Sequence, residues 1–215
     1  VRAPAGDLVV STDSFVVSPI EFPGGDIGSL AVHGTLNDVA MMGATPICLT
    51  AGFVLEEGLP LDVLRRIATS MGAAARAACV PVVAGDTKVV ERGKADGLYV
   101  NTTGVGIAHA TFRPAPHRAA VGDVVIASGP FGRHGMAIMA AREGLAFATT
   151  ITSDSACLVP LVEGLKSTGV DVHAPRVDGP AVGPLRRERE QSEMHRLAVA
   201  VSLAAVEAAA EDVES

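Results

Sequence analysis

Three short stretches near the start of the chain place an acidic side chain among small or apolar neighbours. Asp13 lies in the sequence STDSFVV, Asp38 in GTLNDVA and Asp86 in AGDTK. A buried carboxylate is costly unless it is paired, hydrogen-bonded or bound to a metal. Magnesium binds a few carboxylates and completes its shell with water and phosphate oxygens. The sequence therefore predicts that Asp13, Asp38 and Asp86 converge on one magnesium site.

A lysine strengthens the case for a phosphate ligand at this site. Lys88 follows Asp86 by two residues, so both side chains are expected on the same side of an extended strand. Carboxylates for a metal and a lysine for phosphate charge suit a nucleoside triphosphate. The site is not a P-loop, because the sequence contains no G-x-x-x-x-G-K-[ST]. Taken singly, each aspartate is also consistent with a cap or turn residue, so the prediction depends on the set.

Two histidines are candidates for chemistry, and both are also consistent with a structural role. His33 shares a predicted helix with Asn37 and Asp38 and is a candidate acid–base catalytic residue. His134 follows a glycine-spaced turn, SGPFGRHG, that could wrap an anion at a helix N-terminus. An ordinary strand-to-helix turn explains the same glycines equally well.

These residues are carried by alternating strand and helix patterns, which indicate an α/β or α+β layered fold. Asp26 is expected to cap a helix that Gly43 closes, and Pro60 to open an amphipathic helix. In the predicted strand 98–107, Gly104 and Gly106 indicate a bulge or the close approach of another backbone. The other strands are expected at 8–17, 47–55 and 80–84, the last ending at Gly85–Asp86.

A proline-broken link, FRPAPH, separates this region from the rest. We place an N-terminal domain at 1–112 and a C-terminal α/β domain at 113–173. The second domain is expected to contain a strand at 124–127, a helix around Met136 and a helix at 156–166. Residues 174–215 are expected to form a divergent, helical tail, because a proline- and glycine-rich stretch leads into a charged, alanine-rich one.

Composition excludes several classes of protein. The formal net charge of −7 argues against a nucleic-acid surface. No apolar run is long enough to cross a bilayer and no leader opens the chain, so we expect a cytoplasmic location and no membrane partner. The three cysteines, Cys48, Cys79 and Cys157, are widely spaced, and we expect reduced thiols in a core.

Four motifs together resemble HypE, the hydrogenase expression/formation protein of the aminoimidazole ribonucleotide synthetase-like superfamily. They are STDSFVVSP (11–19), FPGGDIG (22–28), NDVAMMGA (37–44) and GDTKVVERGKADG (85–97). The resemblance extends from about Leu8 to about His173. FVVSP and TKVVERG favour HypE over the related kinases and synthetases.

The resemblance implies an ATP site in the N-terminal domain, a homodimer built on the sheet of that domain, and a C-terminal domain that closes over the nucleotide. It places Mg²⁺ at Asp13, Asp38 and Asp86, and the phosphates near Asn37, Asp38, Asp86 and Lys88. It also implies a reaction: a carbamoyl group on a terminal cysteine is activated by ATP and dehydrated to a thiocyanate. The thiocyanate supplies cyanide to the iron of nickel–iron hydrogenase, so a carbamoyltransferase and an iron scaffold are the expected partners.

Three departures from the family pattern lead us to expect an impaired copy. The chain begins after the glycine-rich segment of the family, APRVDG (174–179) stands in place of DPTRGG after His173, and no cysteine stands at the end. We therefore expect a truncated N-terminus and degeneracy after His173. Two alternatives stay open: a non-catalytic dimerising module that binds maturation proteins, and a related ATP-dependent kinase or synthetase.

Overall fold

One helix, α1 (Ile27–Met41), lies at the centre of the molecule, and 12 of its 15 residues are buried. The computed structural model describes residues 4–129, 132–145, 150–176 and 198–201. Asp26 caps α1 as expected: its carboxylate accepts hydrogen bonds from the amides of Gly28 and Ser29, at 2.7 and 3.0 Å. The Ser29 hydroxyl lies 3.2 Å from the Asp26 amide, which completes a capping box.

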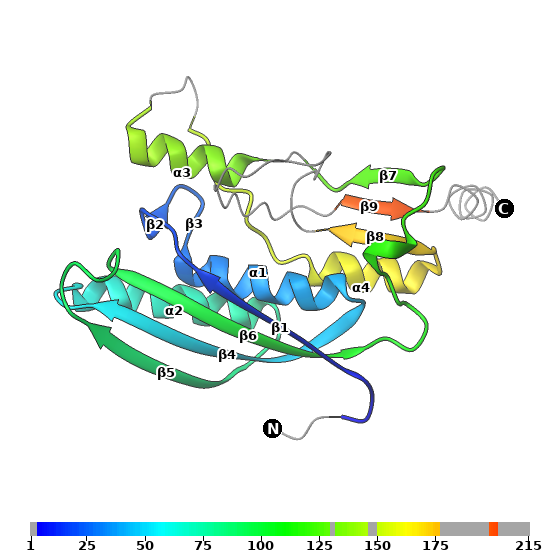
Figure 1. The fold of residues 1–215 in the computed structure, drawn as a ribbon, viewed down its shortest axis with the longest axis horizontal. Coiled ribbons are helices and arrows are strands. Elements are labelled where there is room, and N and C mark those ends of the chain that lie inside the picture. Colours follow the sequence, from blue (N-terminus) through cyan, green and yellow to red (C-terminus); the bar gives the residue numbers. More distant parts are fainter. Residues whose placement is uncertain (1–3, 130–131, 146–149, 177–197, 202–215) are drawn as a thin grey trace.

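A four-stranded sheet lies beneath α1 and α2 (Leu61–Ala77), which cover the same face of it (Figure 1). Its strands, in spatial order, are β1 (Leu8–Phe15), β6 (Leu98–Ala108), β4 (Ala44–Glu56) and β5 (Val82–Val90). β6 is antiparallel to both neighbours, whereas β4 and β5 are parallel. A small hairpin, β2 (Glu21–Phe22) and β3 (Gly25–Asp26), precedes α1. The layered α/β fold is confirmed.

The predicted strand at 80–84 is too short, because β5 continues through Asp86 to Val90. Gly85–Asp86 suggests a turn in sequence, but the backbone there stays extended and pairs with β4. Asp86 is therefore a mid-strand residue.

The second part of the chain packs along α1 through the segment 153–158 and α4. Its described residues include a 3₁₀ turn (Pro116–Arg118), the helices α3 (Arg133–Glu143) and α4 (Val159–Thr168), and the sheet β7 (Val124–Ala127), β9 (Ala198–Val201), β8 (Val172–Arg176). The expected helical tail is wrong at 174–176 and 198–201, which form strands; 177–197 and 202–215 lie outside the described residues. The division at 112/113 stays a prediction, and a small apolar cluster that includes Met41, Phe112, Val162 and Val172 crosses it.

Gly104 and Gly106 allow α1 to lie close to β6. A Cβ at Gly106 would lie 2.5 Å from Val39 Cγ1 and 2.9 Å from the Thr45 carbonyl oxygen. A Cβ at Gly104 would lie 2.9 Å from Thr35 Cγ2. The close approach expected from these two glycines is confirmed.

The contact at Gly106 predicts that Gly106→Ala destabilises the fold. The extra methyl group overpacks the interface between α1 and β6, and overpacking of this kind costs about 1–3 kcal/mol. Gly164→Ala is the control, because the space around Gly164 in α4 is open and alanine is favoured in a helix by about 1 kcal/mol. Urea denaturation should show a lower midpoint for Gly106→Ala and an equal or higher one for Gly164→Ala. Equal midpoints for Gly106→Ala and the unmodified chain would contradict the packing described here.

Candidate nucleotide and metal site

Asp38 is the one acidic residue of α1, and it is exposed at the edge of the sheet where β1 lies. The Ser11 hydroxyl on β1 donates a hydrogen bond to Asp38 Oδ2 at 3.0 Å. Ser11 and Asp13 are two residues apart on one strand, so they share the face toward α1 and their Cα atoms are about 7 Å apart. The structure thus brings Asp13 and Asp38 to the same sheet edge.

Local hydrogen bonds hold Asp13 at the end of β1. Its Oδ1 accepts from the Ser14 amide at 2.7 Å, and the Asn101 side chain donates to the Asp13 carbonyl at 2.9 Å. The carboxylate is half-buried. Asp13 and Asp38, with the Ser11 hydroxyl, therefore form a set of hard oxygen donors of the kind that magnesium binds.

Asp86 does not join this set within one chain. Its partner on β4 is Gly52, which pairs with Asn101 on β6, which pairs with Ser14 on β1. Three strand spacings, or about 14 Å, separate Asp86 from β1. Paired residues also share a face, so Asp86 points to the side of Ser14, away from the helices.

The prediction that the three aspartates converge is therefore wrong for a single chain. Among the described residues, no three His, Cys, Asp or Glu side chains are grouped as metal ligands would be. The reason is topological: β1 and β5 are the opposite edges of the sheet, and alternation along each strand sends Asp13 and Asp86 to opposite faces.

Lys88 lies beside Asp86 as the two-residue spacing predicted. Its Nζ is 2.7 Å from Asp86 Oδ2, and both side chains are exposed. The hydrogen bond from Lys88, followed by one from the Thr87 amide, lowers the pKa of the Asp86 carboxyl. This pair is an ionised, accessible group on the open face of the sheet.

Asn37 is fully buried, and both polar atoms of its side chain bind backbone. Nδ2 donates to the Ala156 carbonyl at 2.9 Å, and Oδ1 accepts from the Leu158 amide at 2.7 Å. This geometry does not support a contact between Asn37 and a nucleotide phosphate.

His33 and His134 bind the same extended segment of the second part. His33 Nδ1 lies 3.1 Å from the Ser155 hydroxyl, and His134 Nδ1 lies 2.9 Å from the Ser153 hydroxyl. Burial lowers the pKa of both imidazoles; the nearby carboxylates of Asp26 and Asp154, respectively, oppose this to a smaller extent. The neutral forms are therefore favoured, and the contacts of both rings are structural.

The expectation that the cysteines are reduced thiols in a core is met only in part. All three are free; Cys48 is buried, Cys157 is half-buried, and Cys79 is exposed at the end of α2 with φ of 57°. Burial raises the pKa of the Cys157 thiol, which disfavours the reactive thiolate there.

No helix within the described ranges is both long and apolar enough to cross a membrane.

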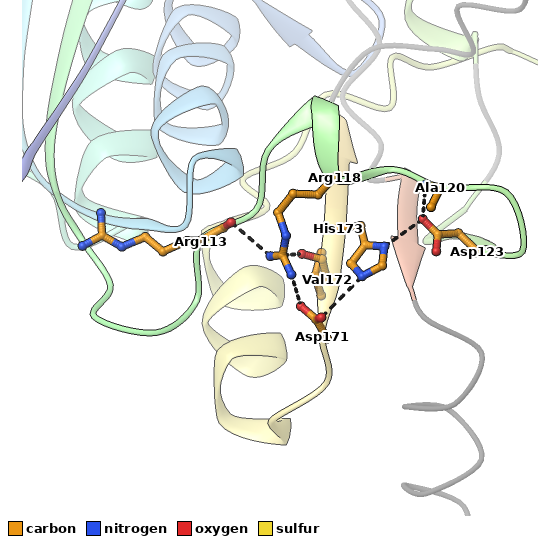
Figure 2. Close-up of polar contacts among 7 residues, drawn as sticks. All are labelled: Arg113, Arg118, Ala120, Asp123, Asp171, Val172 and His173. Carbon is orange, nitrogen blue, oxygen red and sulfur yellow. Dashed lines mark hydrogen bonds and ion pairs between the residues drawn. The ribbon is translucent and has the colours of Figure 1, made fainter.

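A charged network fixes the link between the two parts (Figure 2). The Arg118 guanidinium donates to Asp171 Oδ1 at 2.6 Å and to the carbonyls of Arg113 and Val172 at 3.1 and 3.4 Å. The Ala115 amide also donates to the His173 carbonyl at 2.8 Å. The link is therefore anchored to β8 at several points.

His173 extends the network to the start of β7 (Figure 2). Its Nδ1 lies 2.9 Å from Asp123 Oδ2 and its Nε2 lies 3.4 Å from Asp171 Oδ2. The hydrogen bond from Arg118 lowers the pKa of the Asp171 carboxyl, and the bond from the Ala120 amide lowers that of Asp123. Both carboxylates are thus held in the ionised form.

Sequence reasoning missed two groups of residues: Ser11, beside the candidate carboxylates, and the polar residues 153–155, which bind α1 and α3. Ser11 had a detectable signal, because it lies two residues from Asp13 on the same face of a strand. Ser153, Ser155 and Asp154 had none, because their partners on α1 and α3 are distant in sequence.

Comparison with known proteins shows the family to which the chain belongs. Residues 1–108 match the family of AIR synthase related protein, N-terminal domain. A solved HypE in complex with ATP is 40% identical, with a TM-score of 0.85, over 97% of this chain and 72% of that one. The chain belongs to the HypE family. The resemblance predicted from the four motifs is confirmed.

Other HypE relatives extend this match. "Carbamoyl dehydratase HypE" of Rhizobium leguminosarum bv. viciae is 55% identical over 166 residues, which is 77% of this chain and 47% of that protein. The HypE in a solved HypE–HypF complex is 38% identical, with a TM-score of 0.84, over 95% of this chain and 78% of that one. The chain spans about half the length of the curated HypE relatives that it matches.

The charged network predicts a loss of stability in acid. Because the folded-state pKa of Asp171 is depressed, its stabilising contribution is present above the ordinary carboxyl pKa near 4 and is lost as the pH falls. Asp171→Asn should lower the melting temperature at pH 7 and flatten its decline between about pH 4 and 2. Asp96→Asn, which removes a carboxylate from an exposed loop, is the control. An unchanged acid decline in Asp171→Asn would show that the network contributes nothing to folding.

Proposed function

We propose that the chain acts in nickel–iron hydrogenase maturation, with residues 1–112 binding ATP. In the proposed reaction, ATP drives dehydration of a carbamoyl group carried on a cysteine thiol to a thiocyanate, the source of the cyanide ligands of the iron. The observation that carries this proposal is the match to a HypE that binds ATP, together with carboxylates at one edge of the equivalent sheet. Residues 113–173 form the second domain in this proposal.

The chemistry balances with ATP as the only co-reactant. The carbamoyl oxygen attacks the γ-phosphorus and ADP leaves; loss of the nitrogen-bound protons and departure of phosphate, which takes the oxygen with it, create the carbon–nitrogen triple bond. Asp13 and Asp38 would hold Mg²⁺, which supplies positive charge to the triphosphate. Hydrogen bonding from Ser11 orients the Asp38 carboxylate toward this role.

We further propose that the protein is a homodimer in which each site uses both chains. β1 and β5 each have one neighbouring strand among the described residues, and an apolar edge strand left unpaired invites association. Leu8 and Val10 are 57% and 60% exposed on the face opposite the helices. Pairing β1 with the β5 of a partner would place the strand that carries the partner's Asp86 and Lys88 about 5 Å from β1, so that the edge holding Asp13 and Asp38 would be approached by the partner's Asp86 and Lys88 from the open face of the sheet.

Partner proteins follow from the same family. A carbamoyl-transferring protein and an iron-scaffold maturation protein are the proposed partners, and the solved HypE–HypF complex of a relative supports a partner among the maturation proteins. We also propose a cytoplasmic location for this activity.

The proposed function predicts magnesium-dependent binding of ATP. Isothermal titration with Mg-ATP should give saturable binding, and Asp38→Asn should weaken it at least tenfold, because a carboxylate ligand is lost. Glu57→Gln, on the turn after β4, is the control for removal of an exposed charge. Binding that is equally strong in Asp38→Asn would exclude this carboxylate from the site.

The shared site predicts complementation between two inactive variants. Asp13→Asn and Asp86→Asn should each bind Mg-ATP poorly. When both are unfolded, mixed in equal amounts and refolded, half of the dimers should be mixed, each with one intact site. About a quarter of all sites should then bind with the affinity of the unmodified protein. No recovery in mass-verified mixed dimers would contradict a site shared between chains.

A further inference from the structure

Asn37 and Asp38 are adjacent on α1 but have opposite environments. Asn37 is 0% exposed and is bound through both of its polar atoms to the backbone of Ala156 and Leu158. Asp38 is exposed and is bound to Ser11. Successive residues of a helix are about 100° apart. One turn of α1 therefore binds the segment 153–158 on one side and presents the candidate carboxylate on another.

The segment 153–158 is fastened from several elements. His33, one turn before Asn37 and on the same helix face, binds Ser155 at 3.1 Å. From α3, the His134 amide donates to Asp154 Oδ1 at 2.9 Å, and its ring binds Ser153 at 2.9 Å. The Ser153 amide donates to the Pro23 carbonyl at 2.7 Å. These hydrogen bonds fix the position of the segment 153–158, and α1 packs against it.

We propose that Asn37 is a positioning residue that sets the orientation of the Asp38 carboxylate by locking α1 to the segment 153–158. The proposal rests on the role proposed above for Asp38 in binding nucleotide. A rotation of α1 by 20° would move a side chain about 5 Å from the helix axis by about 2 Å. Misplacement of reacting groups by 1 Å can slow a catalysed step by about a hundredfold, so the orientation of α1 matters although Asn37 does not contact the nucleotide.

His33 makes the lock sensitive to pH. Its ring faces Ser155 on the segment and lies near Asp26 at the start of α1; His134 faces Ser153 and Asp154, and its ring packs on Phe22. Burial favours both neutral rings. Because the folded-state pKa of each is depressed, the stabilising effect is present above the ordinary histidine pKa of about 6.5 and declines as the pH falls below it.

The first test measures position without nucleotide. Asn37→Asp keeps the size and the acceptor for the Leu158 amide but replaces the donor to Ala156. Exchange of the Leu158 amide hydrogen should rise at least tenfold, and the ¹³Cγ signal of Asp38 should shift. Thr45→Val is the control, because it removes a different contact between the two parts, to Glu163 and Lys166, and should leave both signals unchanged. An unmoved Asp38 signal in folded Asn37→Asp would overturn the proposal.

The second test separates this proposal from the proposed function. With Mg-ATP, Asn37→Asp should weaken binding about tenfold, while Thr45→Val should bind normally. If Asp38→Asn weakens binding and Asn37→Asp does not, the positioning role is wrong and the nucleotide site stands. If the Asp38 signal moves but no form binds Mg-ATP, the positioning role stands and the proposed function fails.

The third test uses a conservative substitution. An asparagine side chain can place a polar atom where His33 Nδ1 lies, and it does not titrate. Exchange is compared as the protection factor, which corrects for the intrinsic pH dependence of amide exchange. His33→Asn should keep a high protection factor at the Leu158 amide at pH 7.5 and should lose less of it at pH 5.5 than the unmodified chain does. His33→Leu should exchange rapidly at both pH values. The same pH response in His33→Asn and the unmodified chain would exclude His33 from the lock.

Discussion

Every buried polar group on α1 has to find a partner inside the protein, because 12 of the 15 residues of the helix are buried, and the rest of the structure is arranged around this constraint. Thr35 binds Thr102 on β6 at 2.5 Å, and Thr102 also donates to the Ala31 carbonyl at 3.2 Å. A buried polar atom without a partner costs about 1–3 kcal/mol. The sheet on one side and the segment 153–158 on the other supply hydrogen-bond partners for the buried polar atoms of α1. The two parts of the chain are therefore joined through hydrogen bonds to one helix.

The same burial explains how α1 packs. Against β6 the helix meets glycine, and at the start of α1 a Cβ at Gly28 would lie 2.5 Å from the Ile67 carbonyl oxygen of α2. Contacts this close fix the distance between elements, whereas hydrogen bonds such as those of Asn37 fix the rotation of the helix. Close packing therefore sets the distance of α1 from its neighbours, and the polar contacts set its rotation.

The elements of the fold were largely predictable from local patterns. The cap at Asp26, the amphipathic helix after Pro60 and the close approach at Gly106 each depend on residues near one another in sequence, or on a residue type with a single strong preference. Membership of the HypE family was predictable for a similar reason, because its motifs are continuous. The extent of β5 was not predictable, since Gly85–Asp86 reads as a turn and only pairing with β4 keeps it extended.

The sequence was enough to name candidate residues for the site, but it was not enough to predict how they are arranged in space. The spacing of Asp86 and Lys88 correctly gave a shared face, but which face, and at which edge, depends on strand order. That order is set by pairings such as Leu8 with Ile107, which no local pattern encodes. Asn37 was misplaced for a related reason: its partners, Ala156 and Leu158, belong to the other part of the chain.

The position of β6 between β1 and β4 also constrains how the protein is made. β1 leaves the ribosome well before β6, its strand partner among the described residues, and the two cannot pair until the segment Leu98–Ala108 has been synthesised. At about 5–20 residues per second, this amounts to a wait of roughly 5–20 s. During that interval Leu8 and Val10 belong to an unpaired apolar segment, and the loop that must close is among the longest in the domain. The sheet therefore cannot assemble before Ala108 has been synthesised, and the nascent chain depends on whatever shields β1 until then.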